Sequence, residues 1–577
     1  MDPKPRVEEE ALLHRTQSGS STEYDDEELL AYELDDLEDD PNVTQITATT
    51  PPRWWISPKR RTGRRRNGSG SKFLSFHTPR RRRSIYCRVA QLLMLAPYMI
   101  FSAIIICGVF FPSYSYPPQR YLELRDRVQE LGQTANINDE KVFIAASLYD
   151  HKGELVGGQW GQSVLRLIEI LGPDNVFLSL YENDPDEMAQ AALDEFAKNV
   201  TCDSAIVTEQ LDLQKFPHVS APDGSSYVKR ITFLADVRNR ALRPLEDSAS
   251  TAHNTTFDKL LYLNDVIFDP VDAANLLFST NVDESTGRTQ YRAACAVDFI
   301  NPFKFYDTFA TRDLEGYDTG VPFYPWFTGG GQAESRRDVL EQKDAVRVKS
   351  CWGGMVAFEA KWFQRPGLQK EATGDYGLPS DKASAYHTEM GKTRDDDQES
   401  ADLDLYDSAQ LRFRAETDTY WDSSECCLIH ADLSAMDTAS LAPNETGIYM
   451  NPYIRVAYDG YVLPWLSFTK RFERLYTPIH VIVNWIADRP SFNPRQYQGP
   501  GDEVVDRVWR WDEDSAKALE TGTFTTESEL QGHWEEVNRT AQPGGFCGMR
   551  KLLIINEHPL EGQKKWGKFL PPIPARI

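Results

Sequence analysis

From Lys141 onward the chain alternates short apolar runs with longer amphipathic ones, and this alternation constrains the fold more than any other feature. Residues 141–150 and 175–184 have the pattern of buried strands, and residues 158–172 between them place apolar side chains at helical spacing. Strands that alternate with helices of this length indicate an α/β fold with a mostly parallel sheet flanked by helices. The pattern continues as a helix at 186–200, a strand at 204–210, a helix at 231–247 and a strand at 257–268.

An uncharged stretch at residues 89–111 precedes this region and has about the ~20 residues that a membrane-spanning helix needs. The arginine- and lysine-rich run before it predicts a cytosolic amino terminus, and therefore a single-pass type II membrane protein. A cleaved signal peptide, the alternative, would lie within the first ~30 residues. Residues 1–88 are acidic and then basic, without a periodic apolar face, and are expected to be disordered.

The remaining domain boundaries follow from composition. A stem is expected at 112–140, a ligand-binding or catalytic domain at 141–490, and a carboxyl-terminal extension packed on that domain at 491–577. A polar stretch at 366–410 interrupts the domain and predicts a long surface insertion. The net charge of -24 makes a nucleic-acid partner unlikely by composition, so none is expected.

Glycosylation sequons and cysteines agree with a luminal position for everything after the anchor. Six cysteines follow residue 111, an even number suited to an oxidising compartment, and no paired CxxC motif indicates a zinc module. The sequons are centred on Asn199, Asn254, Asn444 and Asn538.

Polar side chains collect where the predicted strands end, at Asp150, at Glu182 and at Asn264 with Asp265. In open α/β sheets the ligand crevice lies beyond the carboxyl ends of the strands. The chain has no GxGxxG, GxSxG, GxxxxGK[ST] or HExxH motif, which excludes the commonest dinucleotide, hydrolase, phosphoryl-transfer and zinc-protease sites.

Asp265 ends a buried strand, and this position favours a nucleotide-sugar transferase of the GT-A type. Such an enzyme must neutralise a diphosphate leaving group, usually with Mn²⁺ or Mg²⁺ held by a strand-end carboxylate. Asp265 would be that metal ligand and Asn264 a partner that binds or orients the nucleotide sugar. The usual acidic pair is missing, because Val266 and Ile267 follow, and a turn or cap role for Asp265 is the alternative.

Further segments along the chain also carry candidate residues. Arg238 and Arg240 precede the strand and could bind phosphates, although a solvated helix face with an ion pair to Glu246 explains them as well. Later acidic and aromatic segments contain Asp298 and Asp313, a mixture typical of a carbohydrate-facing loop.

A strand-to-turn element follows with Trp352, Gly353 and Gly354, where glycine would let backbone approach a ligand or simply form a tight turn. The last segment holds Glu425, a candidate acceptor-side carboxylate, and His430, a candidate metal ligand whose alternative is a structural core histidine.

The segments LYLNDVIF, FYDTFATRDLEG, VKSCWGGMVAFEA and SSECCLIHADL, in this order, resemble the fungal capsule-associated α-1,3-mannosyltransferase family and its capsule-protein relatives. The resemblance covers roughly Lys141 to Tyr461. It implies a GT-A-like fold, GDP-mannose as donor, a glycan or polysaccharide acceptor, and an α-1,3 linkage formed with retention. It also implies a Golgi membrane location and a complex with other glycosyltransferases.

The resemblance further implies residue roles. Asp265 and His430 would bind the metal, and Glu425, Asp298 and Asp313 would be catalytic. Two alternatives stay open: a non-catalytic membrane-anchored partner in polysaccharide assembly or export, and a luminal transferase with another nucleotide-sugar donor. The nucleotide-sugar pocket would be formed by Arg238, Arg240, Asn264, Trp352, Gly353 and Gly354.

Overall fold

The structure is a computed structural model, and it divides the chain into two units, Met1–Gly108 and Val109–Ile577, which are described separately. Residues 365–409, which contain almost all of the predicted polar insertion, lie outside the described part, as do residues 1–84. The structure describes residues 85–130, 132–221, 225–364, 410–436, 445–521, 532–557 and 565–570.

Helix α2, Ile85–Phe110, covers most of the predicted anchor at 89–111. Its described side chains are apolar and largely exposed, among them Met94, Tyr98 and Phe101. Within the described residues, however, no helix has both the length and the apolar character that crossing a bilayer requires. The predicted transmembrane anchor is therefore not supported.

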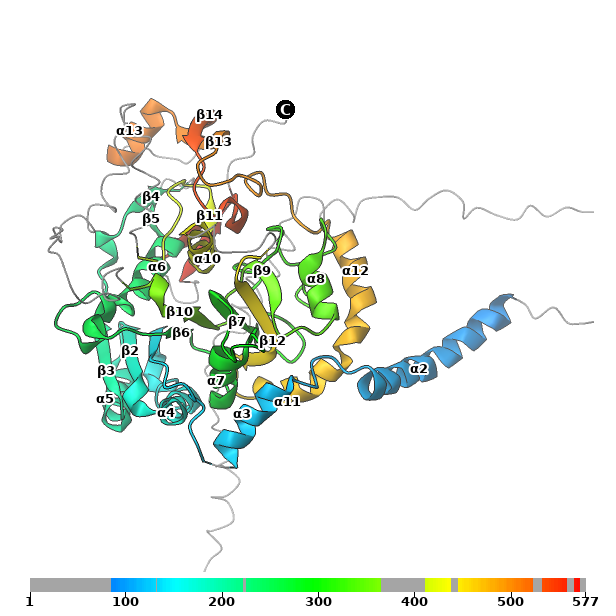
Figure 1. Cartoon of the computed structure of the whole chain (residues 1–577). Coiled ribbons are helices and arrows are strands. Elements are labelled where there is room, and N and C mark those ends of the chain that lie inside the picture. The colour runs from blue at the N-terminus through cyan, green and yellow to red at the C-terminus, as the bar shows by residue number, and fades with distance from the viewer. Residues whose placement is uncertain are drawn as a thin grey trace, which may run out of the picture. The chain divides into compact units, whose positions relative to one another are not determined.

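The unit Val109–Ile577 is built on a nine-stranded sheet with the order β3-β2-β1-β6-β10-β7-β12-β9-β8 (Figure 1). Strands β1, β2, β3 and β6 run parallel, β10 runs antiparallel between β6 and β7, and β12 is parallel to β7. The predicted, mostly parallel α/β sheet is confirmed. The strands are β1 Val142–Leu148, β2 Val176–Asn183, β3 Asp203–Glu209, β6 Lys259–Leu263, β7 Ala293–Phe299, β8 Arg312–Asp313, β9 Val346–Ser350, β10 Met355–Glu359 and β12 Ile448–Ala457.

The alternating pattern placed the first half of the sheet and its helices correctly. Each predicted helix has a counterpart in the structure, although the helix predicted at 231–247 ends early and a short 3₁₀ turn, Arg243–Leu245, follows it. The last predicted strand, 257–268, is regular only as far as Leu263. The helices are α4 Gln159–Leu171, α5 Glu187–Asn199, α6 Arg230–Arg240 and α7 Pro270–Ser279.

Helices cover both faces of the sheet, and the side chains of β1 show how the layers divide. Phe143 and Ala145 point into a core shared with α6 and α10, Glu425–Met436. Val142 and Ile144, on the opposite face, point into a core shared with α4, α5 and α7. This alternation is the period of two expected for a strand buried on both faces.

The predicted stem is part of the folded unit. Helix α3, Gln119–Gln129, buries Tyr121, Leu124 and Val128 in the same core as α4 and α7. Arg125 fixes its outer side through ion pairs to Asp269 and Asp272 at the start of α7. The expectation of a separate stem at 112–140 was therefore wrong for this helix.

The carboxyl-terminal extension is also integrated into the fold. Strand β16 pairs with β5, so the end of the chain completes a second sheet with the order β17-β16-β5-β4. The Cys427–Cys547 disulfide links the extension to α10. The remaining elements are α8 Glu334–Leu340, α11 Val462–Thr469, α12 Tyr476–Ile486, α13 Glu513–Thr521, β4 His218–Ser220, β5 Ser226–Lys229, β11 Asp422–Ser423, β13 Glu503–Trp511, β14 Gly532–Thr540, β15 Gly548–Met549, β16 Leu552–Ile555 and β17 Trp566–Phe569.

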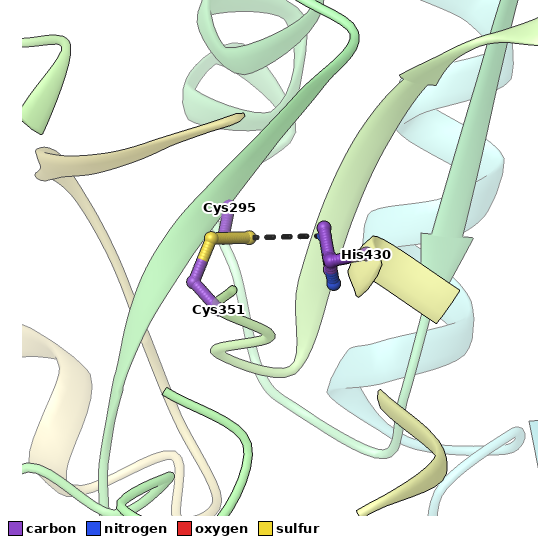
Figure 2. A group of neighbouring side chains, drawn as sticks. All are labelled: Cys295, Cys351 and His430. Carbon is purple, nitrogen blue, oxygen red and sulfur yellow. Dashed lines mark hydrogen bonds between the residues drawn. A yellow bond between two sulfur atoms is a disulfide. The ribbon is translucent and has the colours of Figure 1, made fainter. Parts of the chain in front are cut away.

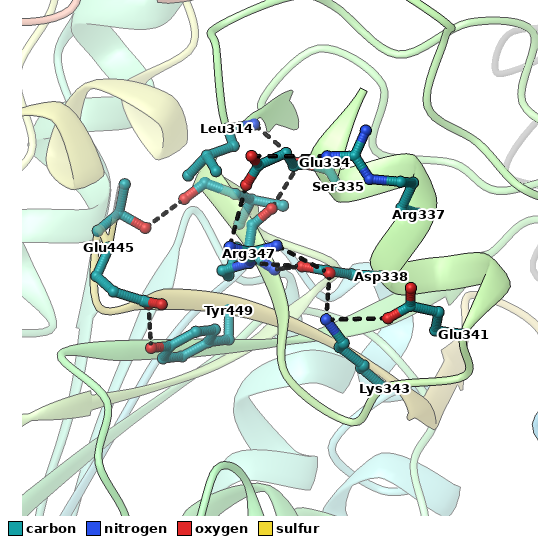
Figure 3. A network of polar contacts seen from close by, with 12 residues as sticks. Leu314, Glu334, Ser335, Arg337, Asp338, Glu341, Lys343, Arg347, Glu445 and Tyr449 are labelled. Carbon is teal, nitrogen blue, oxygen red and sulfur yellow. Dashed lines mark hydrogen bonds and ion pairs between the residues drawn. The ribbon is translucent and has the colours of Figure 1, made fainter. Parts of the chain in front are cut away.

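A polar network attaches α8 to the far edge of the sheet (Figure 3). Arg347 on β9 donates from Nε and Nη2 to the two carboxylate oxygens of the buried Asp338, at 2.8 and 3.0 Å. Lys343 adds a bond of 2.6 Å to the same carboxylate, and Glu334 pairs with Arg347 from the helix start. These bonds to the charged form hold the pKa of Asp338 below its usual value despite its burial.

Candidate active site

The parallel strands of the sheet end at one edge, and polar side chains gather there. Strands β1, β2 and β6 are parallel neighbours, and β7 and β12 reach the same edge beyond β10. The turn before β10 enters the sheet at this edge because β10 runs in the opposite direction. The residues gathered there are Asp150, Glu182, Asp265, Asp298, Tyr458 and the turn Trp352 to Gly354.

Asp265 lies just past the end of β6 and is half-buried. Its carboxylate accepts a hydrogen bond from its own backbone N–H, and no other described residue pairs with it. Burial raises the pKa of Asp265, the charge of Asp150 raises it further, and Arg238 opposes both. Asp265 is therefore a carboxylate that is available to a ligand at the predicted position.

Four predicted site residues come together beside Asp265, but they bind one another. The Arg238 guanidinium donates from Nε to Glu425 Oε1 at 3.0 Å and from Nη1 to Asn264 Oδ1 at 2.8 Å. Trp352 donates from Nε1 to the same Asn264 oxygen at 3.2 Å, and its ring lies 4.7 Å below the guanidinium carbon. Asn264 and Glu425 are thus occupied by a buried network that joins β6, α6 and α10.

Arg240 does not join this network. It donates from Nε to Asp236 at 2.6 Å and also pairs with Glu209, the last residue of β3. Glu246, the expected partner in the alternative interpretation, pairs instead with Arg412 at 2.5 Å. Arg238 and Arg240, which the sequence analysis assigned to one phosphate site, therefore bind different partners in the structure.

Gly353 and Gly354 allow the turn before β10 to pack closely against its neighbours in the core. Both have positive φ, at 58° and 66°. A Cβ on Gly353 would lie 2.1 Å from the carbonyl oxygen of Ala296, and one on Gly354 would lie 2.4 Å from Val266 Cγ1. These approaches to neighbouring strands explain both glycines as turn residues.

Asp298 ends β7 and belongs to a buried carboxylate pair. Its Oδ1 accepts the backbone N–H of Asp307 at 3.1 Å, and its Oδ2 accepts the hydroxyl of Tyr458 at 3.1 Å. Burial and the neighbouring Asp307 raise the pKa of Asp298 to about 8. Asp307 in turn accepts the backbone N–H of Gly353 at 3.2 Å, which connects the pair to the turn before β10.

Asp313 lies in strand β8 and organises a turn. Its Oδ1 accepts the backbone N–H groups of Glu315 and Tyr317, at 2.9 and 2.8 Å. Burial raises its pKa to about 6 although these bonds favour the charged form. These contacts support a structural role and do not support the predicted catalytic one.

His430 lies in the core on α10 (Figure 2). Its Nδ1 lies 2.8 Å from the carbonyl oxygen of Cys426, its Nε2 faces Cys295 Sγ at 4.0 Å, and its ring stacks on Phe358. Burial lowers its pKa to about 4. Cys295 and Cys351 are joined in a disulfide, so the three residues do not form a metal site, and this placement does not support His430 as a ligand beside Asp265.

The family model described as cryptococcal mannosyltransferase 1 matches residues 141–432, just over half of the 577-residue chain. The chain belongs to the cryptococcal mannosyltransferase 1 family. The matched segment runs from the start of β1 into α10, so it includes Asp265, Asp298 and Glu425. The predicted family is confirmed, and with it a glycosyltransferase.

Two further comparisons were informative to different degrees. No curated protein matches this family member. A solved structure, mannosyltransferase PcManGT from Pyrobaculum calidifontis in complex with GDP-Man and Mn2+, is similar at 10% identity, over 69% of this chain and 85% of that one, with a TM-score of 0.28. GDP-Man and Mn2+ are bound by that protein.

Sequence reasoning missed three residues of the site in this mannosyltransferase-family chain. Asp307 and Tyr458 hold Asp298, and Arg230 at the start of α6 lies near enough for its charge to lower the pKa of Tyr306, a phenol beside Asp298. Tyr458 directly follows strand β12, so the rule that ligands lie beyond strand ends could have found it. Asp307 belongs to the segment FYDTFATRDLEG but was assigned no role, whereas nothing in the sequence shows that Arg230 lies near Tyr306.

The carboxylates at this edge fit a divalent cation held by one protein ligand. Among the described residues, the only group of three with metal-ligand spacing is the cluster around the disulfide, so Asp265 does not belong to a preformed cage. Mg²⁺ commonly binds through one or two carboxylates, substrate phosphates and water. A single unpaired strand-end carboxylate has the chemistry for that arrangement.

Proposed function

We propose that this chain transfers mannose from GDP-mannose to a hydroxyl of a glycan or polysaccharide, forming an α-1,3 linkage with retention. Membership of the mannosyltransferase family supports the sugar and the reaction class. One observation carries the assignment to a site: the Asp265 carboxylate is unpaired among the described residues, at the sheet edge where such folds bind ligands.

Asp265 would hold Mn²⁺ or Mg²⁺ together with the donor diphosphate. The ion would supply charge neutralisation for the leaving group. Arg238 is a positioning residue in this proposal, because its guanidinium fixes Asn264 and Trp352 next to Asp265. Glu425 keeps that guanidinium in place.

Retention requires either a carboxylate nucleophile or a route in which the leaving phosphate accepts the acceptor proton on the same face. Two carboxylates predicted to be catalytic are occupied: Glu425 binds Arg238, and both oxygens of Asp298 accept hydrogen bonds. This favours the second route. The acceptor oxygen bonds to the anomeric carbon as the carbon–phosphate oxygen bond breaks, and the acceptor proton moves to the leaving diphosphate.

The second candidate function is a non-catalytic partner in polysaccharide assembly. The residues after Asp265 favour this function. The usual second carboxylate is missing there, because Val266 and Ile267 follow and are buried in the core. In this case the fold would be retained without donor binding.

The secretory pathway, and the Golgi lumen within it, is the proposed location. Two disulfides support an oxidising compartment. The sequon asparagines Asn199, Asn254 and Asn538 are exposed on the surface, as glycan acceptors must be, whereas Asn444 lies outside the described residues. A complex with other glycosyltransferases remains an expectation from the family.

Calorimetric titration of residues 109–577 with GDP-mannose tests the function, with and without Mn²⁺. Metal-dependent binding that is lost in Asp265→Asn and kept in Asp313→Asn supports the transferase, because both variants remove a carboxylate charge but only Asp265 is unpaired. Metal-dependent binding of another nucleotide sugar instead would change the donor assignment. A folded protein that binds no nucleotide sugar would favour the non-catalytic partner.

A further inference from the structure

Helix α12 presents its apolar residues to the outside and its polar residues to the core. His480 and Asn484, one turn apart, are 1% and 6% exposed. On the other side, Ile479 and Ile482 are 54% and 57% exposed, and Trp485 is 82% exposed. This is the reverse of the arrangement expected for a helix on the surface of a water-soluble domain.

The buried polar side is held by hydrogen bonds, so the orientation of α12 is fixed. Asn484 Oδ1 accepts the backbone N–H of Val321 at 2.7 Å. His480 Nδ1 lies 3.0 Å from an Arg336 nitrogen and 2.9 Å from Asn484 Nδ2. Rotating the helix to bury its apolar side would break these contacts and leave Val321 N–H and Arg336 without their partners on α12. The exposed side therefore needs an apolar partner.

The exposed apolar surface continues on the preceding helix. Trp465 and Phe468 of α11 are 59% and 55% exposed, and their rings pack edge to face at 6.3 Å. Leu466, between them, is buried in the main core. The α11–α12 face is defined here as Trp465, Phe468, Ile479, Ile482, Trp485 and Ile486.

The charges around this face differ from those of the chain as a whole. The chain carries 87 acidic and 63 basic residues, yet the segment 461–487 contains Lys470, Arg471 and Arg474 against one acid, Glu473. Glu473 is buried and accepts a hydrogen bond from Arg455 Nη2 at 2.9 Å. Arg471 is exposed and Lys470 and Arg474 are half-buried, so the net charge of the segment is positive in an acidic protein.

We propose that the α11–α12 face lies on an anionic lipid bilayer, with its apolar side chains in the interfacial region. An 11-residue helix is only about 16 Å long, roughly half the ~30 Å hydrocarbon core, so α12 would lie along the membrane. Exposed tryptophan next to aliphatic side chains and basic residues is the composition of interfacial helices.

A second copy of the chain fits this face less well. The closed two-fold dimer places the same patch on both sides of the interface. Lys470 and Arg471, which lie between the two helices in the chain, would then be present on both sides of the interface, and like charges at an interface are unfavourable. Exposed Arg471 has no ion pair with any described residue that could neutralise it. Anionic lipid supplies the opposite charge.

Quenching of tryptophan fluorescence by brominated lipids tests the proposal in the full chain on vesicles of anionic lipid. Helix α2 contains no tryptophan, so its own contact with lipid does not contribute directly. We expect strong quenching that falls in Trp485→Phe and is unchanged in the matched variant Trp534→Phe on β14. We also expect Arg471→Glu to weaken quenching on anionic vesicles and to leave it unchanged on neutral ones.

Equal quenching in wild-type protein and Trp485→Phe would overturn the proposal. So would a stable dimer without lipid that Ile482→Asp converts to a monomer, because the face would then be an interface between copies. The proposal does not rest on the transferase activity. Donor binding by the same variants separates the lipid proposal from the transferase proposal, since loss of lipid contact would leave GDP-mannose binding intact.

Discussion

Arg238 Nε lies 3.0 Å from Glu425 Oε1, although the two residues are 187 positions apart in the chain. The pair is buried, and the guanidinium also binds Asn264 and covers the ring of Trp352. One arginine thus joins the end of β6, helix α6, the start of α10 and the turn before β10. Asp265 follows Asn264 directly, so its position depends on this pair.

Replacing Glu425 by alanine should destabilise the fold, because Arg238 would keep a buried charge without its partner. The side chains of Arg238 and Glu425 are 11% and 4% exposed, and breaking such a pair costs about 3–5 kcal/mol of unfolding free energy. Chemical denaturation of Glu425→Ala measures this loss. We expect donor affinity to fall as well, since Asn264 and Trp352 lose their common support.

The double variant Arg238→Met with Glu425→Leu is the control for that prediction. Removing both charges should recover much of the stability lost in Glu425→Ala, because no unpaired ion remains. A double variant that is less stable than Glu425→Ala would show that the two residues do not act as a pair.

His430 should make the protein sensitive to acid. Burial lowers its pKa from 6.5 to about 4, so the folded state binds fewer protons than the unfolded state between these values. The stability is fully present above pH 6.5 and is lost as the pH falls toward 4, by an amount on the order of 3 kcal/mol. Denaturation curves between pH 7 and 4 measure it.

His430→Gln should flatten the dependence of stability on pH in this window. His480 also has a pKa lowered to about 4 and would preserve part of the slope. An unchanged slope in His430→Gln would mean that His430 is accessible to protons in the folded state, which contradicts its packing against Phe358 and the disulfide.

Removing the Cys427–Cys547 disulfide should strongly destabilise the unit. The bond closes a loop with a separation of 120 residues, for which the chain-entropy model gives about 4–5 kcal/mol. Thermal melting of Cys427→Ser/Cys547→Ser measures the effect, and Cys202→Ser, which removes an unpaired thiol, is the control. Equal melting temperatures for the two proteins would contradict the pairing.

Deleting the segment before Lys141 should unfold part of the domain, since α3 is not a spacer. Tyr121, Leu124 and Val128 are buried, and their loss would expose the side of α7 that they cover. We expect residues 141–577 to melt at a lower temperature and to aggregate more than residues 109–577. Leu122→Asp, on the exposed side of α3, should have little effect. Equal melting of both fragments would restore the stem interpretation.

Local periodicity predicted β1, β2, β3, β6 and the helices among them, because each of these elements is recognisable from its own residues, but it did not predict β4 and β5. It also placed Asp265 at the end of a strand. It did not predict that β10 inserts antiparallel between β6 and β7, since strand order depends on contacts far apart in the chain. For the same reason the sequence showed neither the Arg238–Glu425 pair nor the Asp298–Tyr458 bond.

The predicted roles of His430 and Asp313 lack support in the structure for a common reason. His430 and Asp313 belong to residue types that bind metals and substrates, and both are buried among structural partners. The apolar residues of α12 show the converse, because several of them point outward. Residue type indicates what a side chain can do, whereas its surroundings in the fold decide which of these roles is open to it.

Strand β16 has a consequence for how the protein is made. The last strand of the nine-stranded sheet in chain order ends at Ala457, so that sheet can assemble while the ribosome is still adding residues. Strand β5, which leads directly into α6, must wait for residues 552–555 before it gains its second neighbour. The strand that leads into the helix carrying Arg238 is therefore completed only near the end of synthesis. A polypeptide released early would contain every strand of its central sheet and leave β5 without the neighbour at residues 552–555.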